Sequence, residues 1–175
     1  MRKGAFSFCD VDMYERYGVL VSNVDDQLMP ALRPRKVIVP DRSGAFDYGA
    51  KYRDERIITL ECGTITTVSR SDIREFAYSL SHKGPLRLWD EEDKYYMGRI
   101  YDPDEIIRRM ERFRQFTLSF VCDPYAYGRI VEVSFRNSAD WTYGGTAPTQ
   151  AVITIYNPGT KKNGITITKR EKQEL

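Results

Sequence analysis

Four consecutive carboxyl side chains, Asp90–Asp93, are the residues of this sequence that could most readily do chemistry. Clustered carboxylates can bind Ca²⁺, and a separated pair can cleave a glycosidic bond. Here the run lacks the alternating oxygen ligands and the turning glycine of an EF-hand loop. No second carboxylate can be singled out as a glycosidase partner. The run is therefore interpreted either as a solvated turn or as one half of a protein contact.

The other reactive side chains lack the partners that catalysis or metal binding needs. The cysteines lie far apart without CxxC spacing, so neither a disulfide framework nor a four-thiolate zinc site is expected from these three: Cys9, Cys62 and Cys122. His82 follows Ser79 and Ser81, but the sequence has no Gly-x-Ser-x-Gly elbow. His82 is better explained as a polar cap at a helix end. The sequence therefore predicts no enzyme, no bound metal and no cofactor.

Length and charge exclude several other classes. The 175 residues fit one domain with a small appendage. With 27 Lys and Arg against 25 Asp and Glu, the net charge is only +2, which gives no electrostatic case for nucleic-acid binding. The N-terminus does not resemble a signal peptide, and no apolar run approaches the roughly 18 residues of a membrane span. We expect a soluble product made in the cytoplasm, without membrane insertion.

Short strands dominate the pattern of elements, so the expected fold class is mainly β. Residues 22–35 are expected to be irregular and residues 41–49 to be rich in turns, because Asp, Pro and Gly interrupt them. Residues 103–113 fit a helix or a strand equally well. The expected strands are residues 5–8, 17–21, 36–39, 56–65, 116–122, 129–136, 151–156 and 164–168.

One helix is predicted, over residues 72–82. Ser71 is the expected N-cap, and apolar residues at helical spacing form one stripe: Ile73, Phe76, Ala77 and Leu80. Gly84 is expected to close the helix as a left-handed cap. A hairpin then joins residues 86–89 to residues 94–101 through the acidic turn. Its aromatic residues suit an interface or a sandwich core, and we expect about half of them in each role: Trp89, Tyr95, Tyr96 and Tyr101.

Taken together, these segments resemble the distal tail protein family of long-tailed, non-contractile phages. Four blocks carry the resemblance, and their order and spacing over residues 5–128 are more specific than any one of them. They are Phe6-Ser-Phe8 with Tyr17-Gly-Val-Leu-Val21; Val39-Pro-Asp-Arg-Ser-Gly44 with residues 52–58; the helix over residues 71–80 with residues 86–100; and Phe116–Gly128.

The resemblance implies that residues 1–128 form an N-terminal β-sandwich domain with one helix and an extended hairpin. Six copies would close into a ring through that hairpin, which reaches the neighbouring subunit. The ring would join the tail tube protein to the tail-tip hub, or tail-associated lysin, in the virion of a phage or prophage. DNA would pass through its channel without specific binding. Residues 129–175 would begin a galectin-like jelly-roll domain, too short here to be complete.

Two sets of residues are candidate contact sites. The acidic turn could meet basic residues across the ring, and reversing the charges of Glu91 and Glu92 should then weaken assembly; the basic residues are Arg99, Arg108, Arg109, Arg112 and Arg114. Alternatively, the turn is solvated and the arginines pair locally. Trp141 and Tyr143, in a glycine-rich loop, could stack on a sugar ring. That feature supports an alternative function, a monomeric β-sandwich module that binds saccharide at the host cell surface.

Overall fold

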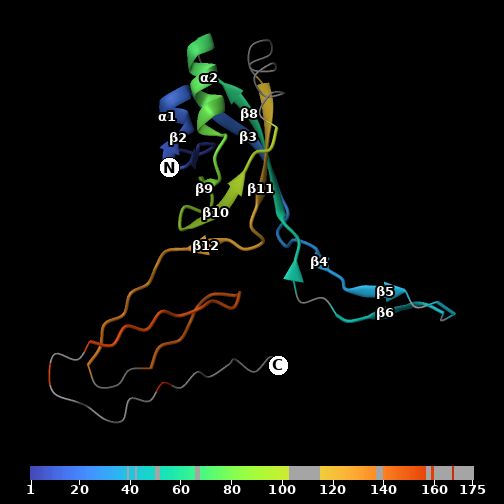
Figure 1. Cartoon of the computed structure of the whole chain (residues 1–175). Coiled ribbons are helices and arrows are strands. Elements are labelled where there is room, and N and C mark those ends of the chain that lie inside the picture. The colour runs from blue at the N-terminus through green and yellow to red at the C-terminus, as the bar shows by residue number, and fades with distance from the viewer. Residues whose placement is uncertain are drawn as a thin grey trace. The chain divides into compact units, whose positions relative to one another are not determined.

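The computed structural model describes residues 1–38, 40–41, 43–49, 52–65, 68–102, 115–136, 140–156, 159 and 167. The chain divides into two compact units, Met1–Arg136 and Asn137–Leu175. Every helix and strand of the described residues lies in the first unit (Figure 1). The boundary predicted after residue 128 separates two domains that would fold independently. A division by internal contacts does not test independent folding, so that boundary stays a prediction.

One large antiparallel sheet is the main part of the first unit, which confirms the mainly β prediction. Its strands follow the order β2-β1-β9-β10-β11-β8-β3, and β12 pairs with β10 beside this path. The strands are β1 (Phe6–Phe8), β2 (Val11–Asp12), β3 (Val19–Asp26), β8 (Arg56–Thr64), β9 (Gly84–Leu88), β10 (Lys94–Arg99), β11 (Gln115–Cys122) and β12 (Tyr127–Gly128).

This sheet folds over on itself into a sandwich. β10 and β11 pair only at Gly98–Cys122 and Arg99–Val121, whereas β11 pairs with β8 along its whole length. Beyond this short joint the two halves of the sheet face each other. The ring centroid of Phe120 on β11 lies 5.2 Å from that of Phe8 on β1, although two strands, β9 and β10, separate β1 from β11 in the sheet order.

Alternation along the strands builds the core between the two halves. On β8 and β11 every second side chain is buried, as the period of two requires. Leu60 and Leu118 pair directly across these strands and are both fully buried. The predicted strands over residues 5–8, 56–65 and 116–122 and the predicted hairpin around residues 90–93 are confirmed within a residue or two.

The predicted helix is present as α2 (Arg70–Ser79), but its cap differs from the prediction. Ser69, not Ser71, is the N-cap: its hydroxyl accepts from the Asp72 backbone N–H at 3.2 Å, and the Asp72 carboxylate accepts from the Ser69 backbone N–H at 3.2 Å. This reciprocal capping box satisfies two N–H groups at once, which a cap at Ser71 would not do. Ile73, Phe76 and Leu80 are buried as predicted.

The C-terminal end of α2 also differs from the prediction. Leu80, in right-handed conformation, is the C-cap, and Gly84 instead begins β9. The hydroxyls of Ser79 and Ser81 donate to the carbonyls of Phe76 and Tyr78, each at 2.7 Å. These serines therefore do the capping predicted for His82. The His82 ring packs edge-on against Tyr78, with 5.2 Å between the ring centroids.

We expect Ser69→Ala to lower the free energy of unfolding by about 1 kcal/mol, because it removes a capping hydroxyl. Ser71→Ala is the matched control. Ser71 is exposed in the first turn of the same helix, and its loss should change stability by less than about 0.5 kcal/mol. Urea unfolding followed by circular dichroism measures both variants. Equal effects of the two substitutions would contradict the assignment of the cap.

A second, short helix was not predicted. α1 (Met13–Tyr17) begins at Asp12, whose carboxylate accepts from the backbone N–H groups of Tyr14 and Glu15. It ends at Gly18, whose φ of 67° lies in the left-handed region that favours glycine. Tyr17 packs edge-on against Phe76, with 5.3 Å between the ring centroids. α1 and α2 therefore close the core together.

Residues 27–55 form a two-stranded extension, called the arm below. β4 (Leu32–Arg33) pairs with β7 (Tyr52–Arg53), and β5 (Lys36–Ile38) pairs with β6 (Ala45–Asp47). The arm lies between β3 and β8 in the chain, so it prolongs both strands beyond the sheet (Figure 1). The prediction of an irregular segment at residues 22–35 holds for residues 27–31 and 34–35 but not for residues 22–26 and 32–33, which lie in strands. The prediction of turns over residues 41–49 holds for residues 41, 43 and 44, whereas Ala45–Asp47 form β6, because cross-strand pairing overrides the turn signals there.

Two of the strands predicted beyond residue 128, at residues 129–136 and 151–156, are not formed. Residues 129–136 and 140–156 contain no strand, and Ile130 and Val152 are 89% and 93% exposed. Residues rich in Val and Ile favour strands only when a neighbouring strand pairs with them. The unsettled segment 103–113 lies outside the described residues, as does the strand predicted at residues 164–168 except for Ile167, which is not in a strand.

Candidate interaction surfaces

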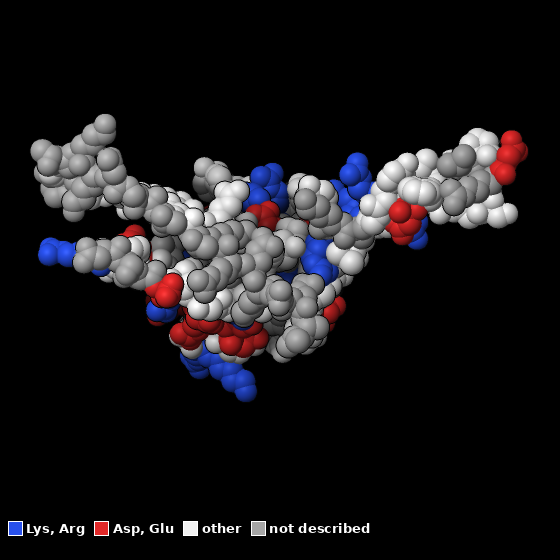
Figure 2. Space-filling model, turned by 90° about the horizontal axis from the view of Figure 1, so that it is seen from below, with Lys and Arg blue, Asp and Glu red and all other residues white. Residues whose placement is uncertain are grey.

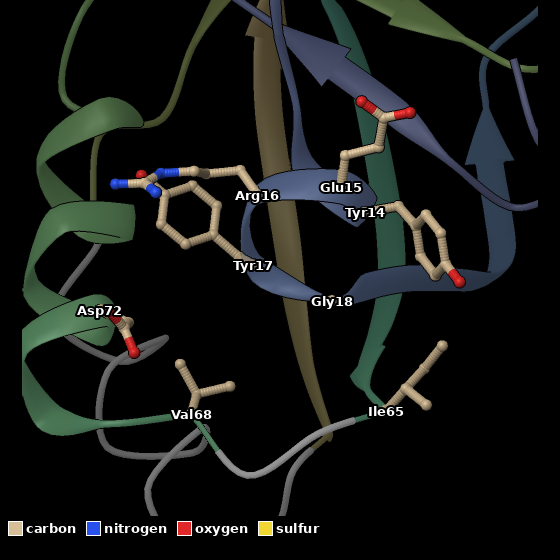
Figure 3. A pocket seen from close by; sticks show the side chains of 8 residues that line it. All are labelled: Tyr14, Glu15, Arg16, Tyr17, Gly18, Ile65, Val68 and Asp72. Atoms are coloured by element: carbon tan, nitrogen blue, oxygen red, sulfur yellow. The ribbon is translucent and has the colours of Figure 1, made fainter.

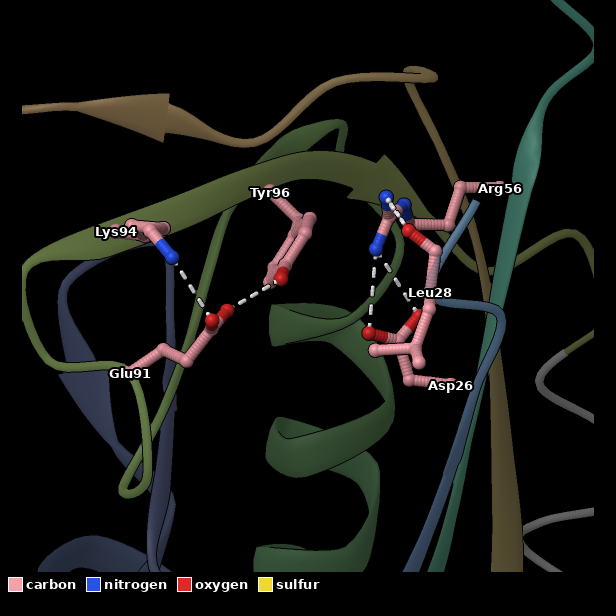
Figure 4. A network of polar contacts seen from close by, with 6 residues as sticks. All are labelled: Asp26, Leu28, Arg56, Glu91, Lys94 and Tyr96. Atoms are coloured by element: carbon pink, nitrogen blue, oxygen red, sulfur yellow. Dashed lines mark hydrogen bonds and ion pairs between the residues drawn. The ribbon is translucent and has the colours of Figure 1, made fainter. Parts of the chain in front are cut away.

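The acidic turn splits into one inward and three outward carboxylates. Glu91 accepts a hydrogen bond from the Tyr96 hydroxyl at 2.5 Å and pairs with the Lys94 ammonium at 2.9 Å (Figure 4). These two donors, Tyr96 first, lower the pKa of Glu91 below its usual range. Burial, and then Glu91, raises the pKa of Tyr96. Glu91 is thus bonded within its own hairpin and is not available for a partner.

Asp90, Glu92 and Asp93 are exposed, and Glu92 contacts the amino group of Met1. Glu92 and Asp93 border a groove of about 700 Å³ whose floor includes Pro85, Tyr95 and Met97. Two of the three exposed carboxylates therefore border a groove that Arg87 and Arg129 also line.

The basic residues proposed to face this turn are only partly described. Arg99 is exposed, with its guanidinium 5.8 Å from the centre of the Tyr101 ring. Arg108, Arg109, Arg112 and Arg114 lie outside the described residues. The contact between the acidic turn and these arginines therefore stays a prediction.

The aromatic residues of the hairpin divide between core and surface. Tyr96 is buried and Trp89 packs against the core, whereas Tyr101 is 68% exposed. Tyr95 stacks on Tyr127 of β12, with ring centroids 5.4 Å apart and an interplanar angle of 18°. These side chains therefore contribute to the core and to the outside of the same sheet half.

The arm carries the largest set of exposed apolar side chains on a regular element. Val37 and Phe46 pair across β5 and β6, and the Phe46 and Tyr48 rings are 4.7 Å apart. Ile38 is 82% exposed and Tyr48 66% exposed. Uncharged residues cover most of the visible arm in Figure 2, where it extends to the right. Sequence reasoning missed this surface, although the alternation Phe46-Asp47-Tyr48 is typical of a strand with one apolar face.

The outer face of β3, β8 and β11 has the opposite character. Its described side chains are mostly polar and include two carboxylates but no Lys or Arg: Leu20, Asn23, Asp25, Ile57, Thr59, Glu61, Gln115, Thr117, Ser119 and Val121. Thr117 pairs with Glu61, and Ser119 with Thr59, across β11 and β8. This face is therefore wettable and weakly acidic.

The architecture can be compared with known proteins at this point. Among solved structures, the chain is similar to the Dit protein of phage SPP1, described as a paradigm of the hub adsorption apparatus in phages that infect Gram-positive bacteria. The TM-score is 0.52 and the identity 21%, over 71% of this chain and 52% of that one. The fold is that of a phage distal tail protein. The chain spans about half the length of that structure. No protein-family model and no curated protein matches the sequence.

A shallow groove between α1 and α2 is bordered mainly by polar side chains. Arg16 and Tyr17 point toward α2, and Ile65, Val68 and Asp72 complete the rim (Figure 3). The Arg16 guanidinium donates to Glu75 at 2.6 Å, and Asp72 belongs to the capping box. Intramolecular bonds thus already engage the charges of Arg16 and Asp72.

Trp141 and Tyr143, the residues proposed for saccharide stacking, lie together in the second unit. Their ring centroids are 6.1 Å apart, and the side chains are 55% and 39% exposed. An exposed aromatic pair of this kind can offer a ring face to a sugar. Whether it binds saccharide stays a prediction.

The buried thiols are not suited to nucleophilic chemistry. Burial raises the pKa of Cys62, and it raises that of Cys122 to about 12. A thiol of high pKa is almost entirely protonated at neutral pH. No group of three or more His, Cys, Asp or Glu that could hold a metal occurs among the described residues. In the same part of the chain, no helix is long and apolar enough to cross a membrane.

Proposed function

We propose that this chain is a structural component of a phage tail tip. Copies of it assemble into a ring that joins the tail tube to the tail-tip hub. The resemblance to distal tail proteins implies six copies in this ring. It connects two parts of the tail and needs no catalysis and no cofactor. It acts in the virion after synthesis in the host cytoplasm. The exposed apolar arm on a distal-tail-protein fold is the observation that carries this proposal.

The arm needs a partner surface for physical reasons. A two-stranded ribbon has no core of its own and is at best marginally stable in water. Exposed, contiguous apolar side chains such as those of Val37, Phe46 and Tyr48 mark a protein interaction site. A protruding element that binds a different surface on the next copy makes a heterologous contact, and such contacts close into a ring when the rotation permits. The arm therefore supports ring formation.

The outer face of β3, β8 and β11 supports a central passage. DNA binding depends on Lys and Arg neutralising phosphates, with release of counterions. The described side chains of this face include Asp25 and Glu61 but no cation. If this face lines the channel, DNA can pass without being held, as the resemblance implies.

The ring is tested by the solution mass of the purified chain, measured by light scattering over a concentration series. We expect the wild type to approach about six times the 20.4 kDa chain mass. The double variant Val37→Ser/Tyr48→Ser, in the arm, should remain monomeric. Tyr78→Ser is the matched control: Tyr78 is also a largely exposed tyrosine, but on α2, so this variant should assemble like the wild type. A wild type and an arm variant of equal mass would contradict the role of the arm.

The role of the acidic turn in assembly requires a separate variant in the same light-scattering experiment. Reversing Glu91 would break its bonds to Tyr96 and Lys94, so weakened assembly would have two explanations. Asp90→Lys/Asp93→Lys reverses exposed charges while keeping the contact of Glu92 with Met1, and should weaken assembly most at low salt, where surface charges are least screened. Normal assembly of this variant would remove the turn from the interface and leave the arm in place.

The second candidate function is saccharide binding at the host surface by a monomer. The exposed Trp141–Tyr143 pair is the observation that favours it. A monomeric wild type whose melting temperature rises with added glycan, and whose response is lost in Trp141→Ala, would support it against the ring.

A further inference from the structure

The backbone pairing between the two strands that carry the arm is interrupted where the arm leaves the sheet. β3 and β8 pair as far as Asp26–Ile58, and pairing resumes only at Leu32–Arg53 of β4 and β7. A hydrogen bond from the Asp54 N–H to the Ala31 carbonyl, at 2.9 Å, marks the near edge of the resumed ladder. Between these points side chains, not the backbone ladder, must hold the two strands together.

Arg56, the first residue of β8, spans this interruption. One guanidinium nitrogen donates to the Asp26 carboxylate at 3.2 Å, and the other donates to the Leu28 carbonyl at 3.0 Å (Figure 4). Through Arg56, β8 is thus hydrogen-bonded both to Asp26, the last residue of β3, and to the segment that follows it. The planar fork of arginine suits this double contact, which a single ammonium could not make.

The same guanidinium also contacts the other half of the sandwich. It thereby fixes the root of the arm, the stretch between the pairs Asp26–Ile58 and Leu32–Arg53, against that half. It lies 5.1 Å from the centre of the Tyr96 ring on β10. Tyr96 is held in turn by Glu91, and Glu91 by Lys94. Arg56 is only 8% exposed, so the contact is made inside the protein. The position of the arm root is therefore tied to the acidic hairpin.

Two further arginines cross the arm just beyond Arg56. Arg53 donates to the Pro30 carbonyl at 2.9 Å, and Arg33 pairs with Asp54 at 2.8 Å. The Arg33–Asp54 pair is exposed, so it is screened by solvent and contributes little. Among the described arginines of this region, only Arg56 is itself buried.

Stability does not explain this buried pair. Burial, the largest cause, raises the pKa of Asp26 above its usual range, although Arg56 acts to lower it. The Arg56 Nε is buried and has no hydrogen-bond partner among the described residues. Buried ion pairs often contribute no more to stability than apolar side chains of the same size, and some serve to fix geometry instead.

We propose that Arg56 is a positioning residue that holds the arm in its assembly geometry, by joining the leaving strand to the returning strand and seating both on Tyr96. The consequence for assembly rests on the proposed function, whereas the consequence for the arm itself does not. An arm held in place before association loses less conformational freedom on binding, which strengthens association.

The double variant Asp26→Asn/Arg56→Met tests this, because removing both charges leaves no unpaired buried ion. Hydrogen exchange of the backbone amides is the readout. We expect the arm amides of Arg35, Tyr48 and Asp54 to exchange about tenfold or more faster, while amides of the β8–β11 ladder keep their protection. The matched control Arg16→Met/Glu75→Gln removes an exposed pair between α1 and α2 and should leave the arm amides unchanged.

Three results separate the alternatives. Unchanged exchange in the arm would overturn the proposal, and so would equal acceleration in the arm and in the β8–β11 ladder, since Arg56 would then act on the whole fold. Faster exchange in the arm alone, with weaker self-association of the same variant by light scattering, would support it. A monomeric wild type whose arm still depends on Arg56 would support the positioning role and count against the ring.

Discussion

Phe120→Ala is expected to lower the free energy of unfolding by about 3–5 kcal/mol, the usual cost of truncating a buried phenylalanine. Phe120 is fully buried on β11, and its ring lies 5.2 Å from that of Phe8 and 6.4 Å from that of Phe6. These contacts join the two halves of the folded sheet. Their loss leaves a cavity between the layers that rigid strands cannot close.

Ser119→Ala is the matched control, because Ser119 neighbours Phe120 but points outward and is exposed. Its effect should stay within about 0.5 kcal/mol. Urea unfolding of both variants, with equal slopes, gives the comparison. A loss of less than about 1 kcal/mol for Phe120→Ala would mean that this ring does not hold the layers together, since core truncations of this size cost more.

The second large effect is expected at the joint of the sheet. A Cβ on Gly98 would lie 2.4 Å from the Cys122 sulfur and 3.3 Å from the Val121 carbonyl oxygen. Gly98 and Cys122 are both buried, so the sulfur or the strands must move to admit the methyl group. We expect Gly98→Ala to destabilise the protein by about 1–3 kcal/mol, the usual cost of overpacking.

The double variant Gly98→Ala/Cys122→Ala identifies the cause of that loss. Removing the sulfur opens the space that the new methyl group needs, so the pair should be less destabilised than the sum of the single variants. Thermal unfolding of all four proteins completes the cycle. Additive losses would indicate that the Val121 carbonyl, rather than the sulfur, limits the space.

Sequence patterns predicted best where burial alternates regularly. Residues 56–65 and 116–122 have strict or nearly strict alternation, and their strands agree with the prediction within a residue or two. The apolar spacing of Ile73, Phe76 and Leu80 likewise predicts α2, because only a helix brings these three side chains onto one buried face. Local periodicity is sufficient in these segments.

Prediction failed where long-range contacts decide the outcome. Pro30 and Pro34 indicate a break, yet Leu32 pairs with Arg53, a partner twenty-one positions away in the chain. Ser69 and Ser71 are equally good caps by residue type, and only the bonds of Asp72 distinguish them. The inward turn of Glu91 depends on Tyr96 across the hairpin. Neither residue type nor spacing could separate Glu91 from the outward carboxylates beside it.

The continuity of the arm with β3 and β8 has a mechanical consequence. A pull on the arm enters the sheet at one end of both strands, at Asp26 and Arg56, so the two strands are drawn in the same direction. The load then passes to the ladder between β8 and β11, which runs from Arg56–Cys122 to Gly63–Gln115. That ladder is loaded in shear, and its hydrogen bonds share the force instead of opening one after another. Tension applied through the arm would thus be borne by the longest ladder among the described strands.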